Sequence, residues 1–109
     1  MTTDKQTSIN LALSTINGKW KLSLMDELFQ GTKRNGELMR ALDGITQRVL
    51  TDRLREMEKD GLVHRESFNE LPPRVEYTLT PDGYALYDAL SSLCHWGETF
   101  AQKKARLNK

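Results

Sequence analysis

Hydrophobic positions in the first third of the chain recur with helical spacing. An apolar stripe of this kind predicts a short first helix that ends at Asn17-Gly18. The stripe consists of Ile9, Leu13 and Ile16. A second helix is predicted from Trp20 to Phe29, because apolar residues recur on two of its sides, and Gly31 would end it. This dense pattern predicts that the second helix is well buried.

Two further helices are predicted with a tight turn between them. Asn35 can cap a short third helix, and Asp43-Gly44 then forms the turn. Thr46 can cap a fourth helix that ends at Gly61, which suits a left-handed conformation. The inward-facing positions are Leu38, Met39 and Leu42 in the third helix and Leu50, Leu54 and Met57 in the fourth. Two helices joined by a tight glycine-containing turn are typical of a helix-turn-helix.

After Gly61 the pattern changes from helical to alternating. Residues 62–68 and 75–79 are predicted to pair as a β-hairpin, with Pro72-Pro73 in the loop between them. Thr80-Pro81 is an N-cap followed by proline at the first helical position, and it begins a last helix. Its apolar positions are Tyr84, Leu86, Tyr87, Leu90, Leu93, Trp96 and Phe100. The order of elements predicts a mainly α fold with a small β-hairpin (α+β): a winged helix-turn-helix with additional N- and C-terminal helices for dimerisation.

Composition limits the classes of protein to which the chain can belong. A length of 109 residues fits one domain, residues 1–109, and 16 basic against 15 acidic residues give a net charge of +1. The N-terminal residues lack the apolar core of a signal peptide and no apolar run could span a membrane, so we expect an intracellular, cytoplasmic protein without a membrane partner. The chain has one cysteine, two histidines and no recognisable catalytic motif. We therefore expect no metal, no cofactor and no enzymatic activity.

The outward face of the fourth helix is the main candidate for chemistry. Its polar residues are Gln47, Arg48, Thr51, Asp52 and Arg55. Arginine and glutamine can pair with guanine and adenine edges, and threonine can contact phosphate or a thymine methyl, so this face could bind a major groove. The alternative is a solvated face held by charge pairs such as Asp52 with Arg55. The preceding turn and the following hairpin favour double-stranded DNA as the partner.

Three further cations are candidates for contacts to DNA phosphates. Lys33 and Arg34 precede the third helix, and Arg74 lies in the hairpin loop beside the two prolines, where it is the most plausible contact of the wing. Each of them, taken alone, is more often an ordinary surface residue than a contact.

The apolar positions of the last helix are too many for one narrow stripe on so small a domain. We expect a second copy of the chain to cover them, with the first and last helices packing across a two-fold axis. The candidate interface residues are Ile9, Leu13, Ile16, Leu90, Leu93, Trp96 and Phe100. Such a homodimer would favour an inverted-repeat operator. The alternative is that the last helix folds back onto its own monomer.

Residues spread from about Ile9 to Phe100 resemble the HxlR-type transcriptional regulators, a winged-helix group akin to the MarR regulators. The matching residues are Ile16-Asn17-Gly18-Lys19-Trp20, Glu37-Leu38, Gly44-Ile45, Leu50-Thr51, Leu54, Glu58, Asp60-Gly61-Leu62-Val63, Arg65, Pro72-Pro73, Val75-Glu76-Tyr77, Leu79-Thr80, Gly83 and Trp96-Gly97. Flexible ends are expected outside this stretch. The resemblance implies a dimeric, cytoplasmic, sequence-specific DNA-binding regulator that could respond to a small-molecule effector.

The sequence departs from this family at the position of its redox sensor. Many members carry a cysteine before the first helix, and the aligned residue is Thr7, which cannot form a thiolate. Cys94 is a possible substitute sensor, but its place beside Leu93 and Trp96 favours a buried, inert thiol. Two alternatives to a DNA-binding regulator are a winged-helix module that binds protein and a small enzyme, of which the enzyme has the weaker support.

Overall fold

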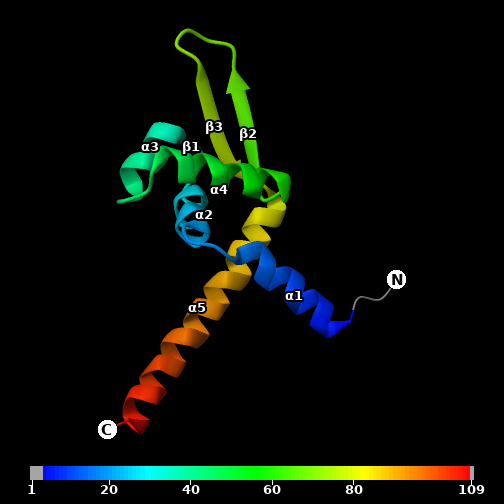
Figure 1. Cartoon of the computed structure of the whole chain (residues 1–109), viewed down its shortest axis with the longest axis vertical. Helices are drawn as coiled ribbons and strands as arrows, with labels where there is room; N and C mark the ends of the chain where they lie inside the picture. Colours follow the sequence, from blue (N-terminus) through cyan, green and yellow to red (C-terminus); the bar gives the residue numbers. More distant parts are fainter. Residues whose placement is uncertain (1–3, 109) are drawn as a thin grey trace.

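The computed structural model of the chain describes residues 4–108 and contains five helices and three strands in this part. The elements are α1 (Lys5–Ile16), α2 (Lys21–Phe29), β1 (Lys33–Arg34), α3 (Asn35–Ala41), α4 (Gln47–Lys59), β2 (Val63–Phe68), β3 (Arg74–Leu79) and α5 (Pro81–Leu107). The predicted fold class is confirmed, since the structure is mostly helical with one small antiparallel sheet, whose β2–β3 hairpin projects away from the helices (Figure 1). The expectation of flexible ends falls partly on residues 1–3 and 109, which lie outside the described residues. Within the described part, helix α1 begins at Lys5 and α5 continues to Leu107, so the chain is helical beyond both ends of the matched pattern.

The core lies where α2, α3, α4, the sheet and the first turns of α5 meet (Figure 1). Its buried side chains are Leu24, Met25, Leu28, Leu38, Leu42, Ile45, Leu50, Leu54, Met57, Leu62, Val63, Leu79 and Leu90. The predicted inward faces of α3 and α4 are confirmed, with Met39 half-buried at the edge. We call this part, from α2 to Leu90, the body.

The prediction that α2 is well buried holds for its middle and not for the ends of its second apolar side. Met25 is buried together with Leu24 and Leu28, whereas Leu22 is 41% exposed and Phe29 is 51% exposed. Phe29 stacks on Tyr87 of α5 with ring centroids 4.5 Å apart. The second apolar side of α2 therefore reaches the core through Met25 and contacts α5 through Phe29.

The ends of α4 follow the sequence prediction. The Thr46 hydroxyl accepts a hydrogen bond from the Val49 amide at the N-terminus. At the C-terminus Gly61 adopts a left-handed conformation (φ +77°), and the Leu62 amide donates to the Met57 carbonyl. Leu62 thus belongs to the helix end, and the strand begins one residue later than predicted.

The start of α3 differs from the prediction by one residue. Asn35 is the first helical residue rather than the cap, and Arg34 occupies the cap position. The Arg34 amide donates to the Glu37 carboxylate, which satisfies one of the free donors at this helix end.

A third strand, β1, joins the predicted hairpin. It pairs antiparallel with β3, so the strand order is β1-β3-β2 and Lys33 lies opposite Tyr77. Strand β3 begins at Arg74, one residue before the predicted start, and Pro72-Pro73 lies in the loop as expected. The sheet therefore joins the hairpin to the N-terminus of α3.

The first turn of α5 packs tightly against the end of α4. The predicted N-cap is confirmed, because the Thr80 hydroxyl accepts from the Gly83 amide and itself donates to the Gly61 carbonyl. A Cβ on Gly83 would lie 2.2 Å from the Leu62 carbonyl oxygen. Only glycine allows this close approach of two backbones.

Two helical segments extend away from the body. They are α1 and the part of α5 beyond Leu90, and we call them the arms; Figure 1 shows them diverging on the side opposite the hairpin. They give a radius of gyration of 16.6 Å, whereas a compact domain of this length has about 13 Å. None of the helices described between residues 4 and 108 is long and apolar enough to cross a membrane.

Candidate nucleic-acid interface

The outward face of α4 is polar and accessible. Arg48 and Arg55 are exposed and lie two helical turns apart on one side, and Thr51 lies half-buried between them. Gln47 and Asp52 are also exposed, and the Gln47 amide donates to the Thr51 hydroxyl. The opposite face of α4 supplies core residues, so the fold fixes which side of this helix faces outward.

The two arginines of this face are not held by carboxylates. In the described part of the chain, no ion pair involves Arg48, Asp52 or Arg55, so the alternative of a face held by Asp52–Arg55 pairing is not realised. The ion pairs of α4 instead involve Arg53 and Glu56 on its flank. Arg48 and Arg55 therefore keep their five guanidinium donors available for a partner.

Arg65 of β2 is a functional candidate that the sequence analysis missed as a contact. A polar hollow of about 370 Å³ separates α4 from the hairpin, and Arg55 and Arg65 both line it, together with Tyr77 of β3. The pairing of Arg65 with Tyr77 in the sheet brings it there. The position of Arg65 beside α4 depends on the strand register of the hairpin, so the helical periodicity of the sequence did not indicate it.

Lys33 and Arg34 lie on β1 at the edge of the sheet, beside the N-terminus of α3. Arg34 is exposed and lies 3.9 Å from the Glu76 carboxylate, whereas no ion pair of the described residues involves Lys33. Lys33 is half-buried. Phosphate contacts by these two residues stay predictions.

Arg74 lies at the base of the hairpin loop with its charge compensated. Its guanidinium pairs with Glu70 at 3.1 Å and Glu76 at 3.6 Å, and it covers the Phe68 ring at 3.9 Å. Arg34 and Arg74 thus share the Glu76 carboxylate. The DNA contact predicted for Arg74 would require these pairs to open or the loop as a whole to approach the duplex.

The predicted dimerisation residues divide into two groups. Leu90 is buried in the core and Ile16 packs against it, so these two act within the monomer. The others are 44–60% exposed on the arms: Ile9, Leu13, Leu93, Trp96 and Phe100. Trp96 and Phe100 stack with ring centroids 4.8 Å apart, which forms a flat aromatic patch on α5.

The remaining titratable candidates lie near α5 or on the hairpin. The expectation that Cys94 is buried is wrong: Cys94 is exposed and lines a cavity of about 260 Å³ to which α1, α2, α4 and α5 all contribute. Nearby, the Asp26 carboxylate accepts a hydrogen bond from Tyr87 and so raises the pKa of that phenol. His64 pairs with Glu66 at 2.8 Å on the exposed hairpin. No group of three potential metal ligands is found in residues 4–108.

Comparison with known proteins gives concordant matches over most of the chain. A family model described as HxlR-like helix-turn-helix matches residues 15–105. An HTH-type transcriptional regulator of Bacillus subtilis (strain 168), YtcD, is 44% identical over 90 residues, which cover 83% of this chain and 71% of the relative.

Solved structures also match most of the chain. A protein described as a transcriptional regulator of the MarR family, from Enterococcus faecalis V583, is 99% identical with a TM-score of 0.90, covering 97% of this chain and 96% of that one. The redox regulator HypR in its reduced form is 43% identical with a TM-score of 0.78, covering 84% of this chain and 91% of the other.

Proposed function

The chain belongs to the HxlR-like helix-turn-helix family, and on that premise we propose that it acts in the cytoplasm as a homodimer that binds an inverted-repeat DNA operator. At the coarser level it is a transcriptional regulator of the helix-turn-helix type. We propose no enzymatic activity for it. The observation that carries the proposal is the outward face of α4, where Arg48 and Arg55 are exposed and form no ion pair with any of residues 4–108.

We assign base contacts to α4. Arg48 and Arg55 would bind guanine edges or adjacent phosphates, and Gln47 would bind adenine once it releases Thr51. Asp52 would accept from a cytosine amine. Each well-formed bidentate contact contributes about 1–3 kcal/mol to discrimination between bases.

Phosphate contacts are assigned to the surroundings of α4. Lys33 and Arg34 flank the N-terminus of α3, and Arg65 faces Arg55 across the hollow between helix and hairpin. These contacts would position the protein without selecting sequence. Arg74 would be the weakest of these contacts to the DNA phosphates, because it already forms ion pairs with Glu70 and Glu76.

The exposed apolar residues of the arms support the dimer. Trp96, Phe100 and Leu93 form a surface that water solvates poorly, and a second copy related by a two-fold axis would cover it. Two α4 helices about 34 Å apart would then meet successive major grooves of an inverted repeat. A small-molecule effector would act by changing this separation.

The proposal is tested by selecting bound duplexes from a random DNA pool and measuring affinity for the selected sequence at two salt concentrations. We expect an inverted repeat, bound at least about 10³-fold more tightly than random DNA, with affinity that falls steeply with salt. Arg48→Ala and Arg55→Ala should each weaken specific binding by about 1–3 kcal/mol.

An equal loss on all sequences would instead identify these two arginines as phosphate contacts. Arg106→Met removes one positive charge from the last turn of α5, on a different side of the helix from Trp96 and Phe100, and serves as the control. If a folded, dimeric protein enriches no sequence, the DNA-binding proposal fails and a module that binds protein becomes the better interpretation.

A further inference from the structure

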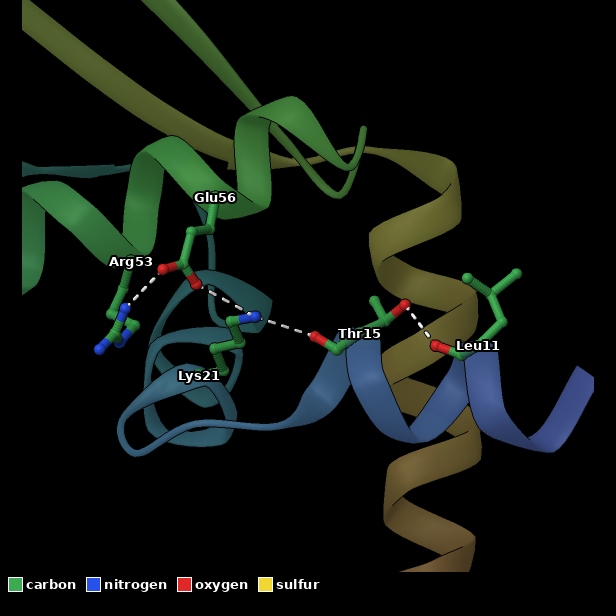
Figure 2. Close-up of polar contacts among 5 residues, drawn as sticks. All are labelled: Leu11, Thr15, Lys21, Arg53 and Glu56. Atoms are coloured by element: carbon green, nitrogen blue, oxygen red, sulfur yellow. Dashed lines mark hydrogen bonds and ion pairs between the residues drawn. The ribbon is translucent and has the colours of Figure 1, made fainter.

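Lys21 is the one charged residue among residues 4–108 that is buried in the core region. It is the first residue of α2, and only 9% of its side-chain surface is exposed. Its ammonium donates to the Thr15 carbonyl of α1 at 3.0 Å and pairs with the Glu56 carboxylate of α4 at 3.2 Å (Figure 2). One side chain therefore connects three helices.

The position of this ammonium is explained by α1 rather than by its own helix. A cation at the N-terminus of α2 is disfavoured by the dipole of that helix. The Thr15 carbonyl, however, is one of the last four of α1 and has no partner within that helix. Lys21 supplies the missing donor and places positive charge at the C-terminal end of α1, where it is favourable.

Helix α1 has few other attachments to the body. It contains no buried residue, and its apolar contact with the core is made by Ile16 in the last turn. In Figure 2 Lys21 lies between the end of α1 and the flank of α4. The direction of the α1 arm therefore depends on the hydrogen bond from Lys21 to the Thr15 carbonyl, on the contact of Ile16 with the core and on the short segment from Asn17 to Trp20.

The other end of the contact is held firmly on α4. Glu56 uses one carboxylate oxygen for Lys21 and the other for the Arg53 guanidinium, at 2.6 Å, one turn earlier on the same helix. Arg53 thus orients the carboxylate toward Lys21 (Figure 2). Neither residue lies on the outward face that carries Arg48 and Arg55, so the contact leaves that face free.

We propose that Lys21 is a positioning residue that fixes the angle between the α1 arm and helix α4, and that it thereby sets the spacing of DNA half-sites that the dimer accepts. This rests on the proposed function, because α1 must contribute to the dimer for the angle to reach the DNA. The Lys21–Glu56 pair transmits the position of the arm to α4 without touching DNA itself.

The first test compares operators that differ only in the spacer between their half-sites. Lys21→Met removes the ammonium but keeps most of the apolar stem. We define the spacer ratio as the affinity for the best spacer divided by the affinity for spacers that are one or two base pairs longer or shorter. We expect this spacer ratio to fall by about five- to tenfold in Lys21→Met. Affinity for a single half-site should stay unchanged, which a general loss of folding would not produce.

Matched variants separate the ion pair from the loss of charge. Arg106→Met also removes one positive charge, from the exposed last turn of α5, and should leave the spacer ratio as in the unmodified protein. Lys21→Arg should restore most of the discrimination. Glu56→Gln removes only the ion pair and keeps the hydrogen bond from Lys21 to the Thr15 carbonyl, so it should lower the spacer ratio less than Lys21→Met. The double variant should match Lys21→Met, because that substitution already removes both contacts.

A second measurement does not depend on DNA. Spin labels at Ser8→Cys on α1 and Asp60→Cys after α4, in a Cys94→Ser background diluted with unlabelled protein, report the distance between the arm and α4. We expect a narrow distribution that broadens in Lys21→Met and not in Arg106→Met.

The outcomes distinguish the two proposals. An unchanged spacer ratio and an unchanged distance distribution in folded Lys21→Met would overturn the role of Lys21. If the unmodified protein binds no inverted repeat, the proposed function fails. The role of Lys21 in spacing then fails with it, and the distance distribution alone decides whether Lys21 orients the arm.

Discussion

The body and the arms are built from similar amino acids but differ in what covers them. Leu28 and Leu54 in the body are almost fully buried, whereas Leu13 and Leu93 on the arms are more than half exposed. Both sets recur with helical spacing. Apolar periodicity therefore shows which side of a helix needs covering, but the covering surface can belong to the same chain or to another one.

This contrast predicts that the two regions respond to different variables. The body's stability should be independent of protein concentration, because its contacts lie within one chain. The arms should be covered by a partner chain. The free energy that their contacts add to stability should therefore grow with protein concentration. Four substitutions test this division, in decreasing order of expected effect.

Leu28→Ala should have the largest effect. It leaves a cavity in a fully buried site and should lower the free energy of unfolding by about 2–5 kcal/mol, measured by chemical denaturation. Leu93→Ala on the arm is the matched control and should change that free energy little in dilute, monomeric protein. Equal losses for both leucines under those conditions would contradict the division.

Trp96→Ala should act on assembly rather than on folding of the body. Loss of an exposed aromatic anchor should raise the dissociation constant of the dimer by about thirtyfold, or about 2 kcal/mol, measured by analytical ultracentrifugation. Leu71→Ala, on the nearly fully exposed tip of the hairpin, is the control and should leave the dimer intact. A monomeric unmodified protein would show that the arms meet a different partner.

Gly83→Ala should destabilise the body by about 1–3 kcal/mol, because the new methyl group would overlap the Leu62 carbonyl. The arm offers the opposite case in Gly97, where a Cβ meets nothing within 4 Å. Gly97→Ala should stabilise the monomer by about 0.5–1 kcal/mol through helix propensity. Thermal melts at low concentration compare the two, and a tolerated Gly83→Ala would refute the close approach.

The smallest effect concerns the start of the α1 arm. The Asp4 carboxylate accepts a hydrogen bond from the Thr7 amide, which lowers the pKa of Asp4 below its usual 3.8. This cap therefore stabilises α1 above pH 3.8 and is lost as pH falls through the lowered pKa. The Thr7 amide proton resonance should titrate with a midpoint below 3.8, and Asp4→Asn should abolish that titration.

Local features could be predicted from the sequence because they depend on neighbouring residues. Helix caps at Thr46, Gly61 and Thr80 are formed by hydrogen bonds between residues three to five positions apart, and all three were identified in advance. The core face of α4 followed from spacing alone. The exposed polar face of α4 followed in turn, because the residues opposite the core face of a helix must face outward.

Features that depend on distant residues could not be predicted. Strand β1 exists because Lys33 lies opposite Tyr77, far along the chain, and two residues alone carry no strand pattern. Leu90 and Leu93 are one turn apart, yet the first is buried and the second exposed, because the body ends between them. The burial of Lys21 likewise arises only when α1, α2 and α4 meet.

The hairpin leaves the helices and returns to them at one point. The chain enters it at Leu62 and leaves at Thr80, and the Thr80 amide donates to the Leu62 carbonyl at 3.0 Å. The two ends of the segment are thus tied together at the base of the β2–β3 ladder. Tyr77 has to stay, because it packs against the core and pairs with β1. The loop 69–73 is the exchangeable tip: grafting the loop of another regulator between Phe68 and Arg74 should leave α4 and α5 in place.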